Sequence, residues 1–301
     1  MRILVTAIAG LYFCLAGGAG HAALTVLACE PEWAALAQEI GGDQVKAASA
    51  TSALQDPHRI EARPSLIART RNADLLVCTG MELEIGWLSI LLQQSGNQKL
   101  APGQPGNFEA GRFITPLEVP TKLDRSEGDV HPGGNPHVQT DPRNIGRVAE
   151  ALARRMAEID HANAALYQSR YKDFAQRWSA AVARWEQQAA PLKGIAVVEH
   201  HKNIDYLLNW LGMREVGTLE PKPGIEPSAA HLQSLLAQLQ RQPARMVLRA
   251  AYQDARASEW LAGQAKIPAV MLPFTVGGTD RAKDLFALFD DTLARLLAAL
   301  K

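Results

Sequence analysis

The chain has 301 residues, of which 47% are hydrophobic and 21% are charged, a composition typical of a folded globular protein. Lys plus Arg and Asp plus Glu each number 31, so the formal net charge is zero and no basic excess indicates binding to nucleic acid or to an anionic membrane. At roughly 100–200 residues per domain, this length favours two domains or lobes.

The first 22 residues have the layout of a secretory signal peptide. Arg2 supplies a positive charge, an apolar stretch follows from Ile3 to Ala19, and Gly20 and Ala22 are the small residues expected at positions −3 and −1 of a cleavage site. An uncleaved membrane anchor is the alternative, but the stretch is short for one. We therefore expect a periplasmic protein whose mature chain begins near residue 23.

Short apolar runs alternate with amphipathic stretches in the first half of the mature chain. This alternation predicts an α/β lobe with a parallel sheet covered by helices. The expected strands are Leu24–Cys29, Val45–Ala50 and Asp74–Cys78, and the expected helices are Trp33–Ile40, Pro64–Arg71 and Glu84–Gln94. The stretch from Leu100 to Pro136 is rich in Pro and Gly, which predicts a long connection with one strand near Phe113–Thr115.

Helical periodicity dominates the middle of the chain. One helix is expected from Asp141-Pro142 to Ile159, and Asp160 can cap a second helix that no Gly or Pro interrupts before Ala190. At 1.5 Å per residue, the second helix would be on the order of 40 Å long, enough to cross a two-lobed protein. Its aromatic and apolar stripe indicates packing into a core rather than a platform for a ligand. The stripe consists of Tyr167, Tyr171, Phe174, Trp178, Val182 and Trp185.

The alternation of strands and helices resumes after Pro191 and predicts a second α/β lobe. Its expected strands are Ile195–Val198, Glu215–Leu219, Met246–Leu248 and Val270–Leu272, and its expected helices are Ile204–Leu211, Ala229–Gln240, Ser258–Ala265 and Ala282–Ala299. The predicted organisation is therefore a signal peptide (1–22), an N-terminal lobe (23–159), a long linking helix (160–190) and a C-terminal lobe (191–301).

Four side chains with metal-binding chemistry occur in the predicted loops. Ligands of open α/β sheets bind beyond the carboxyl ends of strands, and His58, His137, His201 and Asp280 lie in loops of this kind or beside them. Three imidazoles with one carboxylate suit zinc. A single loop histidine is more often a surface residue, and spacing alone does not show that positions so far apart converge. The residues by themselves therefore leave metal binding open.

Several motifs, taken in order, resemble the metal-binding solute-binding proteins of zinc and manganese ABC importers, the cluster A-I family. The resemblance covers essentially the whole mature chain. Its main motifs are Asp56-Pro57-His58 followed by Pro64-Ser65, Ala73-Asp74-Leu75 with Gly80, Glu84 and Trp87, Asn135-Pro136-His137 with Asp141-Pro142, His201 five residues before Tyr206, Glu226-Pro227-Ser228, and Asp280 before the closing helix.

The resemblance implies two α/β lobes bridged by one long helix, with His58, His137, His201 and Asp280 as the ligands of a metal ion in the cleft. Manganese-type members typically carry a carboxylate at the third position, so His201 favours Zn²⁺ over Mn²⁺. The implied function is that of a periplasmic, non-enzymatic binding protein. It would deliver the ion to the membrane permease of an ABC importer, act as a monomer, and have a metal chaperone as a further possible partner.

The chain also departs from the family pattern. Asn135 and Gln139 replace the usual Asp and Trp around His137, and the loop before it contributes only His131 instead of a His-rich segment. A surface position is the simpler expectation for His131, and an auxiliary ligand is the alternative. His200 makes the register ambiguous, and the spacing to Tyr206 favours His201. Glu199 is a candidate partner for a ligating imidazole.

Alternative functions remain open from the sequence. A binding protein for manganese, another metal, an iron chelate or cobalamin would fit the same two-lobed form. A zinc hydrolase fits less well because the chain has no HExxH motif and four protein ligands would close the site to water. An adhesin-like role has no supporting feature. The mature cysteines, Cys29 and Cys78, could form one disulfide or remain two buried thiols.

Overall fold

The computed structural model describes residues 22–301 except 123, 125 and 127. The predicted signal peptide lies outside the described residues, apart from its last residue. Within the described ranges, no helix combines the length and the hydropathy required to span a bilayer.

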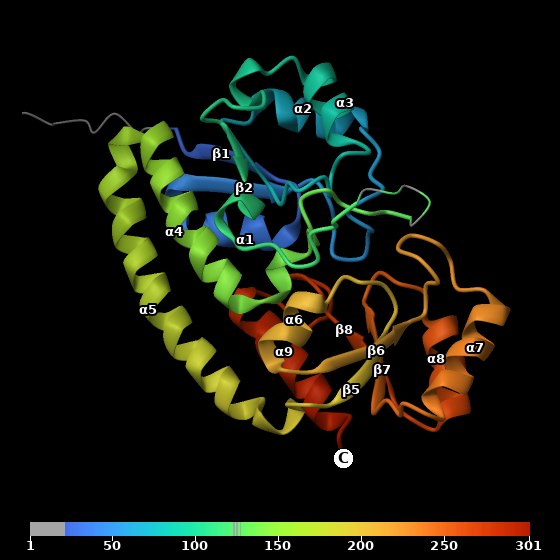
Figure 1. The fold of residues 1–301 in the computed structure, drawn as a ribbon. Coiled ribbons are helices and arrows are strands. Elements are labelled where there is room, and N and C mark those ends of the chain that lie inside the picture. The colour runs from blue at the N-terminus through green and yellow to red at the C-terminus, as the bar shows by residue number, and fades with distance from the viewer. Residues whose placement is uncertain (1–21, 123, 125, 127) are drawn as a thin grey trace, which may run out of the picture.

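Two parallel four-stranded sheets with the same strand order form the centres of two lobes (Figure 1). The first sheet has the order β2-β1-β3-β4, and the second has the order β6-β5-β7-β8. The strands of the two sheets confirm the predicted α/β class. They are β1 (Leu24–Ala28), β2 (Val45–Ser49), β3 (Leu75–Cys78), β4 (Asn107–Glu109), β5 (Ala196–Glu199), β6 (Arg214–Thr218), β7 (Met246–Ala250) and β8 (Ala269–Leu272).

Helices cover both faces of each sheet, so successive residues of the central strands pack into different layers. Val26 packs into the core shared with α1, whereas Leu27 packs into the cluster beneath α2 and α3. In the second lobe, Val197 faces α6 and α9, and Val198 faces α7 and α8. These helices are α1 (Pro31–Gly41), α2 (Pro64–Asn72), α3 (Leu88–Ser95), α6 (Asp205–Leu211), α7 (Ala229–Leu239), α8 (Ala255–Ala265) and α9 (Leu285–Ala298).

Two long helices pack against each other, and the longer one, α5, runs beside both lobes (Figure 1). They are α4 (Pro142–Ile159) and α5 (Ala164–Gln188), which has 25 residues and is shorter than predicted because a 3₁₀ turn occupies His161–Asn163. The predicted core role of its aromatic stripe is confirmed for four residues, which are at most 3% exposed: Tyr167, Phe174, Trp178 and Trp185. Arg170 donates to the Glu39 carbonyl in α1, and Trp185 Nε1 donates to Asp290 in α9, so α5 joins the lobes.

The predicted strand at Phe113–Thr115 is wrong. The fourth strand of the first sheet lies earlier, at Asn107–Glu109, and a 3₁₀ helix follows at Ala110–Phe113. Phe108 is the buried strand residue, and Phe113 stacks on it with ring centroids 5.1 Å apart while remaining 38% exposed. The apolar run that suggested a strand therefore covers the edge of the sheet instead of extending it.

Cys29 and Cys78 form a disulfide. Cys29 directly follows β1 and Cys78 ends β3, and these strands are neighbours in the sheet. The bond decides between the two alternatives that the sequence left open, and it leaves no thiolate at this position for a metal.

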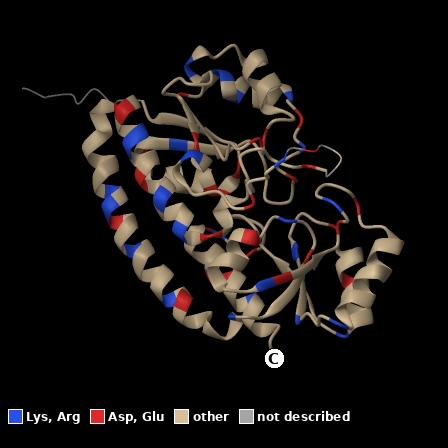
Figure 2. Ribbon diagram, in the orientation of Figure 1, with Lys and Arg blue, Asp and Glu red and all other residues tan. Residues whose placement is uncertain are grey.

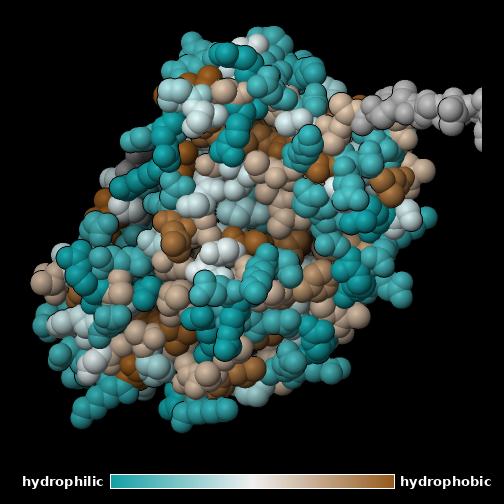
Figure 3. All heavy atoms as spheres, turned by 180° about the vertical axis from the view of Figure 1, so that it is seen from behind, coloured by the Kyte–Doolittle hydropathy of each residue, from teal (hydrophilic) through white to brown (hydrophobic). Residues whose placement is uncertain are grey.

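The surface of the described residues is mixed in character. Charged residues of both signs are spread over the two lobes and along α5 (Figure 2). Seen from behind, hydrophilic side chains cover most of the face, with hydrophobic ones scattered among them (Figure 3). Neither view indicates a single-sign field for a polyanionic partner.

Candidate metal centre

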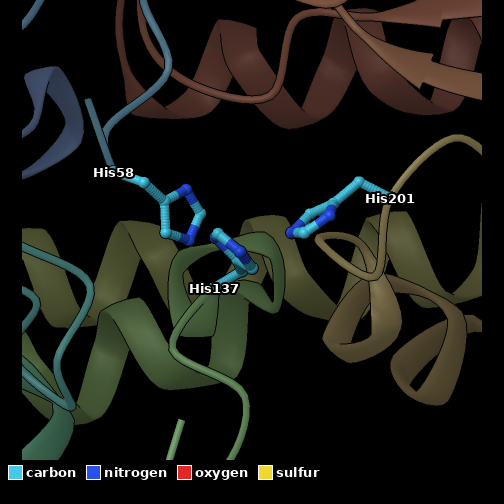
Figure 4. A group of neighbouring side chains, drawn as sticks. All are labelled: His58, His137 and His201. Atoms are coloured by element: carbon cyan, nitrogen blue, oxygen red, sulfur yellow. The ribbon is translucent and has the colours of Figure 1, made fainter. Parts of the chain in front are cut away.

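Three of the four predicted ligands converge. His58, His137 and His201 each place a ring nitrogen within 4.8 Å of the others (Figure 4). The ring centroids are 5.3 Å apart for His58 and His137, 5.6 Å for His137 and His201, and 5.8 Å for His58 and His201. Two of these residues belong to the first half of the chain, and His201 follows β5 of the second lobe. The group therefore lies where the lobes meet.

His58 is held by the loop between β2 and α2. Asp56 Oδ1 accepts the His58 backbone N–H at 3.0 Å and lies 2.7 Å from His58 Nδ1. A carboxylate only accepts, so this contact places the ring proton on Nδ1 and leaves the lone pair of Nε2 free. His58 Nε2 is buried without a hydrogen-bond partner among the described residues. Trp87 Nε1 anchors the same loop by donating to the Pro57 carbonyl at 2.8 Å.

His137 is the most deeply buried of the three, with 1% of its surface exposed. Asn135 Oδ1 accepts the His137 backbone N–H, so the Asn that replaces the usual Asp still shapes this loop. Tyr206 ties the loop to α6, because its hydroxyl donates to the Asn135 carbonyl and accepts from the Leu117 N–H. Neither ring nitrogen of His137 has a hydrogen-bond partner among the described residues. A buried imidazole without partners is unfavourable unless another ligand completes it.

His201 lies directly beyond the carboxyl end of β5. Glu220 Oε2 is 2.7 Å from His201 Nδ1 and also accepts the Gly224 N–H. His201 thus has the same arrangement as His58, with a carboxylate on Nδ1. His200 is not part of the three-histidine group, although its Nδ1 is likewise buried and unpaired in the described chain. Glu199 has no hydrogen bond to an imidazole, so Glu220 occupies the position that the sequence suggested for it.

The surroundings favour the neutral form of His137. Burial, followed by the proximity of His58 and His201, lowers the pKa of His137 well below its usual value. At Asp56, burial acts to raise the pKa, but the hydrogen bond and charge interaction with His58 outweigh it and the pKa is lowered. An uncharged imidazole is the form that binds a metal ion, and an ionised carboxylate behind it increases its basicity.

His131 and Asp280 lie outside the three-histidine group. His131 is half-buried rather than at the surface, with its ring centroid 5.5 Å from that of His58. Burial, with a contribution from His58, lowers the pKa of His131 to about 4. Asp280, the fourth predicted ligand, is exposed. Its loop is held by Thr279 Oγ1, which donates to Asp291, and a Cβ on Gly277 would lie 3.7 Å from Ala53 in the loop that carries His58.

A cavity of about 280 Å³ opens onto His58 and His201 and is rich in carboxylates. Its acidic lining residues are Asp56, Asp129, Glu220, Glu226 and Asp254. Arg59 also lines the cavity, but the carboxylates outnumber it, and an excess of one sign of charge raises the local concentration of the opposite ion. This lining favours the approach of a cation to the imidazoles.

The sequence did not indicate the role of Glu220. It lies 19 positions after His201 and is brought to it by the return of the chain through β6. Asp56 was part of a quoted motif, and its Asx-type contact with His58 could have been inferred from the spacing of two residues. No comparable local signal precedes Glu220.

The fold and the imidazole group define a two-lobed α/β protein with a candidate metal site between its lobes and a long helix linking them. The chain belongs to the ZnuA family, described as the periplasmic component A of a zinc-uptake complex, whose model matches residues 26–299.

Individual relatives are distant in sequence. A metal ABC transporter substrate-binding lipoprotein, ScbA of Streptococcus cristatus, is 24% identical over 54% of this chain and 50% of its own length. The manganese ABC transporter substrate-binding lipoprotein scaA of Streptococcus gordonii is 24% identical over 52% and 48%. The high-affinity zinc uptake system protein ZnuA of Yersinia pestis is 23% identical over 61% of each chain. The alignments thus span about half to three fifths of these relatives.

The fold is shared more completely than the sequence. A crystal structure of ZnuA superimposes with a TM-score of 0.76 and 22% identity, covering 93% of this chain and 100% of the other. At this identity the superposition establishes the architecture alone.

Proposed function

We propose that this protein is a periplasmic binding protein that captures Zn²⁺ between its lobes and delivers it to the membrane permease of an ABC importer. The observation that carries the proposal is the convergence of His58, His137 and His201, together with the buried, unpaired ring nitrogens of His58 and His137. Coordination would satisfy these nitrogens, which otherwise cost free energy on burial. The family and its relatives, whose names include metal ABC transporter proteins, support the transport role.

The ligand chemistry favours zinc over manganese. Imidazole nitrogen suits zinc, whereas manganese prefers carboxylate and water oxygen. The two carboxylates closest to the group, Asp56 and Glu220, lie behind imidazoles, on Nδ1, instead of facing the metal position. Since the relatives include both zinc-named and manganese-named proteins, the family alone does not decide between the ions.

Asp280 is the proposed fourth ligand of the zinc-bound form. Tetrahedral zinc with three imidazoles has one further position. In this structure the Asp280 loop lies against the His58 loop at Gly277 and Ala53, but the carboxylate is outside the group, so binding would require the loop to move inward. A closed set of four protein ligands would leave no position for a catalytic water, which argues against the alternative of a zinc hydrolase.

Calorimetric titration of metal-free protein with Zn²⁺ and with Mn²⁺ tests this proposal. We expect one zinc ion per chain and much weaker binding of manganese. Absence of zinc binding would refute the proposal, and tighter binding of manganese would refute the choice of ion. Elemental analysis of the purified protein provides a second readout, and model ester and peptide hydrolysis by zinc-loaded protein tests the enzymatic alternative.

A further inference from the structure

A second group of potential metal ligands lies apart from the histidines. Glu199, Asp205 and Glu215 each offer a carboxylate oxygen, and these oxygens lie within 4.8 Å of one another. Glu199 ends β5, Glu215 lies on the adjacent strand β6, and Asp205 begins α6. The pairing of β5 with β6 and the turn into α6 thus bring three acidic side chains together; we call this group the acidic triad.

Glu199 is the unusual member of the acidic triad. It is 0% exposed, and neither of its carboxylate oxygens has a hydrogen-bond partner in the part of the chain that the structure describes. Its two neighbours are at least partly satisfied. Asp205 Oδ2 accepts from Asn135 Nδ2 at 3.0 Å, and Glu215 Oε2 lies 3.4 Å from Lys202 Nζ. Burying an ionised carboxylate without a partner is costly, so either a proton or a compensating cation is expected at Glu199.

The nearby lysine does not supply that compensation. Lys202 Nζ donates to Glu118 Oε1 at 2.5 Å and pairs with Glu215, and no hydrogen bond joins it to Glu199. Glu118 adds a fourth carboxylate to the surroundings, so four acidic groups face one ammonium. An all-oxygen set with an excess of negative charge is the environment that a hard divalent cation prefers.

We propose that the acidic triad binds a hard divalent cation of the calcium type, with Glu199, Asp205 and Glu215 as its protein ligands. Calcium tolerates irregular geometry and accepts six to eight oxygens, so water and the remaining carboxylate oxygens can complete its shell. Zinc and other softer ions are directed to the imidazoles instead. The two sites would therefore select ions of different chemistry.

A bond network connects the acidic triad to the histidine site. Asn135 Nδ2 donates to Asp205 and to Glu118, while Asn135 Oδ1 accepts the backbone N–H of His137. Glu199 also lies two residues before His201 on the same strand end. A cation in the acidic triad would fix both loops, and by linkage any effect on zinc affinity must be matched by an equal effect of zinc on the affinity for that cation.

Calcium titration of zinc-loaded protein tests the proposal, because the imidazoles are then occupied and are poor ligands for Ca²⁺. We expect one Ca²⁺ per chain and a higher melting temperature. Lys202→Met should tighten calcium binding at least tenfold because it removes the competing ammonium. Glu199→Gln, Glu215→Gln and Asp205→Asn should each weaken binding at least tenfold. Glu259→Gln, which removes an exposed carboxylate of α8, should leave it unchanged.

The outcomes are separable from those of the zinc proposal. Metal-free His58→Ala protein should bind Ca²⁺ as tightly as the metal-free wild type does. This comparison holds even if neither protein binds zinc. If neither the wild type nor Lys202→Met binds Ca²⁺ at millimolar concentration, the acidic triad holds a proton at Glu199 instead and the proposal is wrong. Calcium binding that survives undiminished in the folded Glu199→Gln and Asp205→Asn variants would also overturn it.

Discussion

Glu220 Oε2 lies 2.7 Å from His201 Nδ1, and this contact joins the loop after β6 to the imidazole after β5. The carboxylate fixes the ring orientation and directs Nε2 toward His58 and His137. Removing a group that accepts the other ring N–H of a metal-ligating histidine changes metal affinity by about 10–100-fold. We therefore expect Glu220→Gln to weaken zinc binding by about that factor, measured by competition with a chelator of known affinity.

Glu226→Gln is the matched control for this variant. Glu226 lines the same carboxylate-rich cavity, and among the described residues no hydrogen bond joins it to His58, His137 or His201, so its change removes an equal charge without releasing a proposed ligand. If both variants weakened zinc binding equally, the effect would come from the field of the cavity, and the orienting role of Glu220 would be rejected.

Alanine substitutions at the three converging histidines should each reduce zinc affinity by at least about 100-fold, since each removes one of the proposed ligands. His200→Ala tests the register, because His200 adjoins His201 but lies outside the group. Titration calorimetry should show a much smaller loss for this variant than for His201→Ala. The reverse order would make His200 the ligand.

Asp280→Ala should weaken zinc binding less than removal of a histidine, because the Asp280 carboxylate is exposed here and must move to reach the ion. Asp284→Ala, which alters the N-cap of α9 four residues later, serves as a control for disturbance of the loop. Identical zinc affinities for Asp280→Ala and the wild type would remove Asp280 from the ligand set.

The pH dependence of stability should reflect Glu32, which accepts a hydrogen bond from Thr275 across the lobes. Burial raises the pKa of Glu32 from 4.5 to about 7, against the lowering effect of that hydrogen bond. Between these values the folded protein keeps a proton that the unfolded chain releases, so stability falls as the pH rises, by at most about 1.4 kcal/mol per unit.

Glu32→Gln preserves an acceptor for Thr275 and removes the titration. The melting temperature of metal-free protein, followed from pH 5 to 8, should therefore decrease less steeply in this variant than in the wild type. Parallel curves would show that Glu32 does not contribute to the slope. Glu39→Gln, a substitution at a partly exposed carboxylate of α1, is a suitable reference.

Removal of the Cys29–Cys78 disulfide should destabilise the protein by about 2–5 kcal/mol, since the bond closes a loop with a sequence separation of 49. The double alanine variant should melt at a lower temperature than the wild type and should not respond to dithiothreitol, which lowers the melting temperature of the wild type. Zinc affinity should be retained, because neither cysteine belongs to the histidine group. A variant as stable as the wild type would contradict this expectation.

The sequence predicted the elements that follow from periodicity. Both sheets, the long helix and its buried aromatic residues depend on local patterns of apolar residues, which the chain carries plainly. The strand at Phe113–Thr115 was misplaced because a short apolar run fits an edge strand and a covering loop equally well. The three histidines could be nominated from motifs, but their convergence could not be derived from spacing.

Other parts of the site depend on contacts across the fold. Glu220 meets His201, and Asn135 meets Asp205, only after the strands have paired and the loops have packed. The sequence offered Glu199 as the partner of an imidazole because it lies two residues before His201. Since β5 ends at Glu199, the regular geometry of the strand does not extend to His201, and closeness along the chain is a poor guide to contact.

The apolar side chains around α5 form one continuous cluster. It includes Val26 of the first sheet, Trp178 of the long helix and Leu248 of the second sheet. Because the two lobes share this core, we expect them to lose their packing together, and heat should unfold the chain in a single cooperative transition. An ion that binds only the folded protein would then stabilise both lobes at once. At a free ion concentration 1,000 times the dissociation constant, the free energy of unfolding of the whole molecule would rise by about 4 kcal/mol.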